Sequence, residues 1–205
     1  MPFVNYSQNY MLTQLTTNHG QYLSLHYAYS PTGANELSGG TYARVVPTWG
    51  TAAGGAISTT SIASAFNVPV NSTVAWVGIW DALTGGNFVG MGPNGGAAQY
   101  GFTAAVTGNL FTAPGSSYSN GTTVVLFDTV DVAQFPSGFL VGGSSGVPFY
   151  YVVSASGATF SLSLTLGGAA ITVSAASAGI VQAITAEAYV AAGNFTVSSD
   201  VLTLV

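Results

Sequence analysis

This chain contains very few charged residues. Its 205 residues include one Lys or Arg and six Asp or Glu, so that 3% of them are charged, against about a quarter in ordinary soluble domains. The single cation is Arg44. One guanidinium cannot neutralise a nucleic-acid backbone or hold a segment on an anionic membrane. We therefore expect no nucleic-acid partner and no membrane partner.

Cysteine is absent as well, which excludes disulfides and thiolate metal sites. The mean hydropathy is positive, yet no window approaches the roughly 18 consecutive apolar residues of a membrane-spanning helix. Residues 1–5 lack the basic and apolar regions of a secretion signal, so none is expected. Because ion pairs are few, the fold should depend on apolar burial and backbone hydrogen bonds, with little sensitivity to salt.

Patterns typical of strands and turns fill the chain after one expected helix over residues 7–18. Ser7 would cap this helix and Gly20 would end it, with Tyr10, Met11 and Leu15 on roughly one face. Strands are expected over residues 22–27, 41–46, 58–68, 73–80, 88–91, 122–127, 147–153, 159–166 and 169–173, and a hairpin over residues 187–205. The strand at residues 73–80 has apolar side chains on both faces, so both should be covered. The fold class is therefore all-β.

A more specific pattern runs through the first half of the chain. It consists, in order, of SLH at residues 24–26, TGANE at 32–36, SGGTYAR at 38–44, FNVP at 66–69, VGIWDA at 77–82 and TGG at 84–86. In order and spacing these segments resemble a family of small bacteriophage tail fibre or minor tail proteins. The resemblance implies a virion structural protein that is not an enzyme and has no catalytic, cofactor-binding or metal-binding residues.

The same resemblance predicts two domains. Family members finish soon after the last of these segments, and the corresponding ending here is displaced to residues 187–204. The stretch between, from about residue 110 to 185, resembles a small β-domain that is inserted in varied phage surface proteins. We therefore expect a β-sandwich-like platform with one short N-terminal helix, formed by residues 1–108 and 186–205, and an inserted, projecting second small β-domain at residues 109–185.

Two glycine-rich segments match enzyme motifs by letter. Residues 90–95 fit G-x-G-x-x-G, but no amphipathic helix follows to bind a pyrophosphate, and a β-turn is the simpler interpretation. Residues 142–146 fit the G-x-S-x-G of serine hydrolases. In that fold the histidine follows the serine, whereas His19 and His26 both precede it.

The histidines and acids also suggest no strong site. His19 and His26 are too few for a protein-bound metal, and structural hydrogen bonds explain them more simply. Asp128 and Asp131 could act as the paired carboxylates of a glycosidase. They lie, however, in an expected loop after a strand.

The densest polar cluster comprises Asn35, Glu36, Tyr42 and Arg44. We expect Arg44 to pair with Glu36 or Asp81 and so to organise the loop between residues 32 and 44. Ligand recognition by this cluster is the alternative.

In the second half, Phe149, Tyr150 and Tyr151 could present ring faces to a host glycan at the surface. Packing in a core is the alternative for these three rings.

Three functions remain after these exclusions. The first is a tail-associated structural protein, a fibre or minor tail component that contacts the host surface through the inserted domain. The second is a capsid (head) decoration protein that stabilises the shell, and the third, more remote, is a glycan depolymerase. The expected partners are other virion proteins and further copies of the chain, because so apolar a surface suggests a symmetric homo-oligomer, with a trimer as its expected form. The expected location is the phage particle, assembled in the host cytoplasm.

Overall fold

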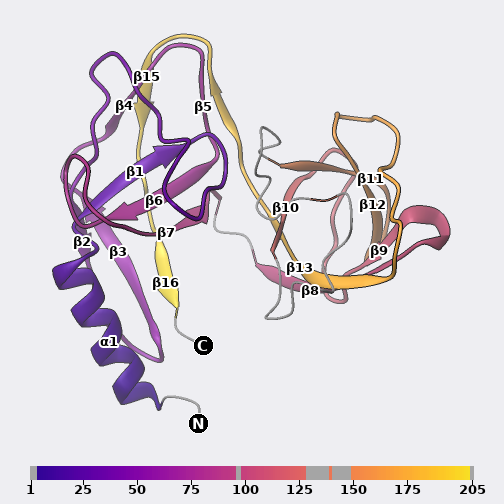
Figure 1. Ribbon diagram of the computed structural model, residues 1–205, viewed down its shortest axis with the longest axis horizontal. Helices are drawn as coiled ribbons and strands as arrows, with labels where there is room; N and C mark the ends of the chain where they lie inside the picture. Colours follow the sequence, from indigo (N-terminus) through magenta and orange to yellow (C-terminus); the bar gives the residue numbers. More distant parts are fainter. Residues whose placement is uncertain (1–3, 96–97, 128–138, 140–148, 204–205) are drawn as a thin grey trace. The chain divides into compact units, whose positions relative to one another are not determined.

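The computed structural model describes residues 4–95, 98–127, 139 and 149–203, which form an all-β fold with one α-helix (Figure 1). Its contacts divide the chain into two compact units. The first, which we call the platform, contains the described residues of 4–27, 31–95 and 187–203. The second, which we call the barrel, contains residues 28–30 and the described residues of 98–186.

Helix α1 (Asn5–Asn18) begins two residues before its predicted start, with Val4 rather than Ser7 at the N-cap and no side-chain cap. Gly20 was expected to end the helix as a left-handed C-terminal cap, but its φ is not positive. At the end of the helix the Leu15 carbonyl accepts the ordinary i to i−4 hydrogen bond from the N–H of His19 and a second one from the N–H of Gly20. The buried residues are Leu12 and Thr16, while Tyr10 is 58% exposed. The buried face of the helix therefore contains Leu12 and Thr16, each one position after the predicted Met11 and Leu15.

Short antiparallel ladders make up the rest of the platform. Two of them are three-stranded sheets: one has β1 (Tyr22–His26), β6 (Trp76–Trp80) and β7 (Phe88–Pro93) in the order β1-β6-β7, and the other has β16 (Val201–Thr203), β3 (Ala56–Ile62) and β2 (Pro47–Trp49) in the order β16-β3-β2. The other two are strand pairs: β5 (Ser72–Val74) pairs with β14 (Glu187–Tyr189), and β4 (Phe66–Val68) pairs with β15 (Gly193–Phe195). Every residue of β6 is buried, so the expectation that both of its faces are covered is confirmed.

The three C-terminal strands do not form the predicted hairpin. Each pairs instead with a strand from the first half of the chain: β14 with β5, β15 with β4 and β16 with β3. In Figure 1 these yellow strands lie beside the indigo-to-magenta strands with which they pair. The end of the sequence therefore completes the platform, a long-range pairing that local turn signals do not reveal.

Several predicted strands also need correction. Residues 41–46 form no strand, and Val45 makes only a single bridge to Leu23. Pro47, which follows the predicted strand at residues 41–46, begins β2, and a proline is tolerated there because β2 is an edge strand. Residues 58–68 contain two strands, β3 and β4, and residues 169–173 form none.

The barrel is a closed ring of six strands. Around the ring these are β10 (Thr123–Phe127), β11 (Tyr150–Ser156), β12 (Thr159–Ser163), β9 (Leu110–Thr112), β8 (Gln99–Ala105) and β13 (Ser177–Ala183). Its core contains Phe102, Phe111, Phe139, Tyr150 and Phe160. Strand β8 pairs with β9 and β13, so the boundary between the units falls near residue 96, whereas the sequence suggested residue 108.

Among the described residues, no helix has the length and apolar character needed to cross a membrane.

Candidate functional site

Arg44, the one cation, joins three parts of the platform. Its Nε and Nη2 donate to the Glu36 carboxylate at 2.9 and 2.7 Å, and its Nη1 donates to the carbonyls of Ala82 and Gly85, both at 2.8 Å. The guanidinium carbon lies 3.6 Å from the centroid of a Trp80 ring. The side chain is only 8% exposed. Arg44 thus fastens the loop at Glu36 to the turn after β6 and to β6 itself.

Asp81, the other proposed partner, is not part of this ion pair. Its two carboxylate oxygens accept hydrogen bonds from the backbone N–H and the side-chain amide of Asn87, at 2.6 and 2.7 Å. These bonds hold the pKa of Asp81 below its ordinary value. Asp81 therefore closes the turn between β6 and β7, while Glu36 alone pairs with Arg44.

Tyr42 connects the ion pair to the core. Its hydroxyl donates to Glu36 at 3.2 Å and accepts the backbone N–H of Leu25 at 2.8 Å. Burial raises the pKa of Tyr42 well above its ordinary value, so the hydroxyl stays protonated. Its ring stacks on Phe66, with centroids 6.3 Å apart. The cluster of Asn35, Glu36, Tyr42 and Arg44 is therefore held by bonds within the platform.

A second polar chain lies beneath this cluster, on β1 and β6. The Trp80 indole N–H donates to Ser24 Oγ at 2.9 Å, Ser24 Oγ lies 2.7 Å from His26 Nε2, and His26 Nδ1 lies 2.9 Å from the Ala34 carbonyl. An indole N–H only donates and a carbonyl only accepts. The neutral tautomer with its proton on Nδ1 therefore satisfies every group, and burial lowers the pKa of His26, which favours this neutral form.

A serine hydroxyl bonded to a histidine is also the arrangement of serine hydrolases. Here both Ser24 and His26 have no exposed surface, and the group behind the histidine is a carbonyl rather than a carboxylate. A substrate could not reach the hydroxyl. Sequence reasoning did not pair these residues, although spacing of i and i+2 on a strand places both side chains on one face.

Two glycines of the sequence pattern make room for this polar chain. Gly78 is the cross-strand partner of Ser24, and a Cβ there would lie 2.5 Å from both Ser24 Oγ and His26 Nε2. Gly33 has a φ of 76°, and a Cβ there would collide with the Trp80 ring. The SLH, TGANE, TYAR and VGIW segments thus meet in one structural network.

The remaining sequence candidates provide no assembled chemical site. Residues 90–93 of the G-x-G-x-x-G match belong to β7, and a turn occurs only at Asn94 and Gly95. The G-x-S-x-G match and the Asp128/Asp131 pair lie outside the described residues. Within the described part of the chain, no three His, Cys, Asp or Glu side chains are grouped so as to hold a metal ion.

The three aromatic residues proposed for surface recognition divide between two environments. Tyr150 is 1% exposed and packs inside the barrel, so its assignment to the surface is wrong. Phe149 and Tyr151 are half-buried, and their rings meet edge to face with centroids 5.4 Å apart. The alternation of a strand explains this division, because neighbours point to opposite sides.

The protein is thus all-β, and the side chains of its densest polar cluster hold the loops of the platform in place. Residues 4–101, slightly less than half of the chain, match the model of a family described as podophage GP4 fiber I protein gp80. This match supports a phage tail fibre family and contains all the segments of the sequence pattern. No curated protein and no solved structure matches the chain.

Proposed function

We propose that this chain is a structural component of a bacteriophage tail, as part of a fibre or as a minor tail protein. The observation that carries the proposal is the match of residues 4–101 to a phage fibre family. These residues contain the Arg44 and Ser24–His26–Trp80 networks, whose polar groups form hydrogen bonds within the platform. A role as a building block explains why such polar groups are committed to holding loops in place.

We propose that the platform attaches the chain to the phage particle and that the barrel is the projecting domain. Apart from residues 28–30, the barrel lies in one continuous stretch of the chain, residues 97–186, between two parts of the platform. Asn94 and Glu187 flank this stretch, and the Asn94 amide donates to the Glu187 carboxylate at 3.3 Å. The two platform ends are therefore adjacent, as an inserted domain requires. The Phe149–Tyr151 ring pair is the barrel's candidate contact with a host glycan.

We further propose that the platform assembles with other virion proteins and with further copies of the chain, as a trimer. Large apolar side chains remain exposed on α1 and at its N-cap, where Tyr6 and Tyr10 are 80 and 58% exposed and Val4 is 68% exposed. Few charges are available to keep copies apart. Association through such surfaces is insensitive to salt, as a particle outside its host requires.

Immunogold electron microscopy of purified phage particles tests the proposed position. Antibodies raised against this chain should label the tail or its fibres, and serum from unimmunised animals should label nothing. Gold distributed over the head would favour a capsid decoration protein instead. Particles that carry no label, although the chain is present in the lysate, would contradict any virion role.

A further inference from the structure

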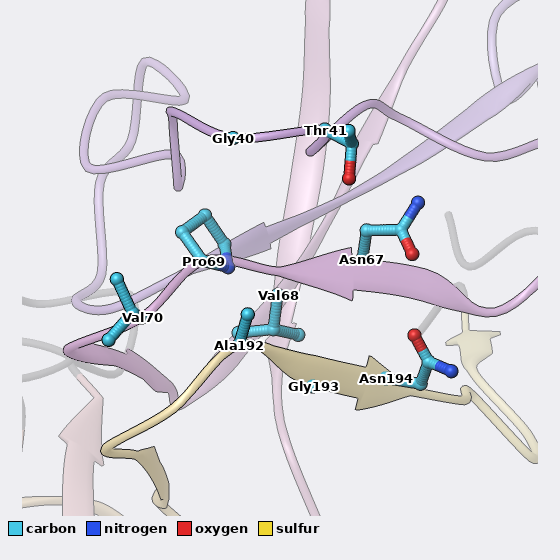
Figure 2. Close-up of a pocket in the computed structure, with 9 residues that line it drawn as sticks. All are labelled: Gly40, Thr41, Asn67, Val68, Pro69, Val70, Ala192, Gly193 and Asn194. Carbon is cyan, nitrogen blue, oxygen red and sulfur yellow. The ribbon is translucent and has the colours of Figure 1, made fainter.

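The platform carries a groove that none of the contacts above uses. It has a volume of about 490 Å³, within the range of small-molecule sites. Its walls come from three separate segments: Gly40 and Thr41, residues 67–70, and residues 192–194 (Figure 2). Strands β4 and β15, which supply two of the walls, are paired with each other.

One end of the groove is polar. Asn67 and Asn194 are direct cross-strand partners, and Figure 2 shows their side-chain amides next to each other, with Thr41 close by. All three residues are exposed, and their side chains form no hydrogen bond in the described part of the chain. Each amide offers one acceptor and two donor hydrogens, and the hydroxyl offers both functions. This set complements neighbouring sugar hydroxyls, which also donate and accept.

The other end of the groove is apolar. Pro69, Val70 and Ala192 lie there, away from the two amides (Figure 2), and Val70 is 54% exposed. This end suits a methyl group on the ligand. None of the nine lining residues is charged, and Arg44 is bound to Glu36. An anionic ligand would therefore find no counter-ion, which favours a neutral one.

We propose that this groove binds a neutral sugar carrying an acetamido group, with the ring hydroxyls on Asn67, Asn194 and Thr41 and the acetyl methyl against Pro69, Val70 and Ala192. The inference rests on the proposed function only for the source of the sugar, the host surface. It places a recognition site on the platform, in addition to the aromatic pair proposed for the barrel.

Titration of the full chain with N,N′-diacetylchitobiose, followed by NMR or calorimetry, tests the site. Cellobiose, which has the same linkage without acetamido groups, should bind at least several-fold more weakly. Asn67→Ala and Asn194→Ala should each weaken binding about tenfold, because each removes one hydrogen-bonding partner. Thermal melting of both variants should match the parent, since the replaced side chains are exposed and make no internal bond.

Leu164→Ala is the control, because it shortens an exposed side chain of the barrel that has no part in either proposed sugar contact and leaves the groove intact. Its affinity for the disaccharide should equal that of the parent chain. The inference would be overturned by no saturable binding at millimolar sugar, by equal affinity for the two disaccharides, or by loss of binding in Leu164→Ala alone. If the sugar does not bind but immunogold labels the tail, the inference about the groove is wrong and the proposed function still holds.

Discussion

Arg44 concentrates several interactions on a single side chain. Its guanidinium makes a two-point contact with Glu36, donates to two carbonyls and stacks on Trp80. Lysine could supply the charge but not this planar fork. Removing it leaves a partly buried carboxylate and two carbonyls without their donor, which costs more than the ion pair itself contributes.

Arg44→Ala should therefore lower the free energy of unfolding by about 3 kcal/mol. Urea denaturation followed by tryptophan fluorescence measures this change directly. The double variant Glu36→Ala/Arg44→Ala is the control, and its loss should be smaller than the sum of the two single losses. An unchanged midpoint in Arg44→Ala would show that the pair does not organise the loop.

Asp200, just before β16, makes stability depend on pH. Its Oδ2 is shut off from solvent and has no hydrogen-bond partner in the described part of the chain. Burial raises the pKa of Asp200 to about 6, from an ordinary value of 3.8. A carboxyl with a raised pKa in the folded state favours folding while protonated. The stability that it contributes is therefore lost as the pH rises from about 4 to 6.

Asp200→Asn should accordingly stabilise the protein above pH 6, by on the order of 3 kcal/mol at most. Near pH 4 the variant and the parent should unfold at similar temperatures. Melting curves recorded at a series of pH values give the difference between the two proteins, which removes the effects of other titrating groups. A difference that stays constant across this range would contradict the assignment.

At the scale of elements, the β1–β6 ladder depends on glycine, which has no side chain, at position 78. Gly78 lies opposite Ser24, and the space above it is filled by Ser24 and His26. Gly78→Ala should force this polar chain apart and cost about 3 kcal/mol. Gly90→Ala, on the neighbouring strand β7, is the matched control because nothing lies within 4 Å of its added Cβ. Equal thermal stability of the two variants would argue against a role for the network in pairing the strands.

The sequence predicted elements best where burial was uniform. Strands β1, β6 and β10 were located because their apolar residues are dense, and β6 is buried throughout. Strand β8 was missed because its buried positions, Phe102 and Ala104, alternate with Gly, Thr and Ala, a weak pattern. In Phe160–Leu166 the alternation suggested one long strand, but β12 ends at Ser163 and Leu164 and Leu166 are exposed.

The candidate site was predictable only in part. Composition identified Arg44 as the sole cation and its neighbours as candidates, and the Arg44–Glu36 contact lies within that set. The choice between Glu36 and Asp81 depends on the turn at Asn87, which spacing does not specify. The groove could not be inferred at all, because Asn67 and Asn194 lie far apart in the chain and meet only through the β4–β15 pairing.

At the scale of the whole molecule, the platform should fold without the barrel. Replacing residues 97–186 with a short Gly-Ser linker should be tolerated, because Asn94 and Glu187 lie within hydrogen-bonding distance. All three tryptophans, Trp49, Trp76 and Trp80, belong to the platform, so their fluorescence reports on it alone. We expect the emission of buried indoles and a cooperative melt. Emission typical of an unfolded chain would contradict the two-domain proposal.

The number of copies of this chain in each purified phage particle tests the central claim most directly. Quantitative mass spectrometry against the major capsid protein measures it. A tail component should be present in a small number of copies, in multiples of three if it assembles as a trimer. A number comparable with that of the major capsid protein would contradict a fibre or minor tail protein and point to decoration of the head.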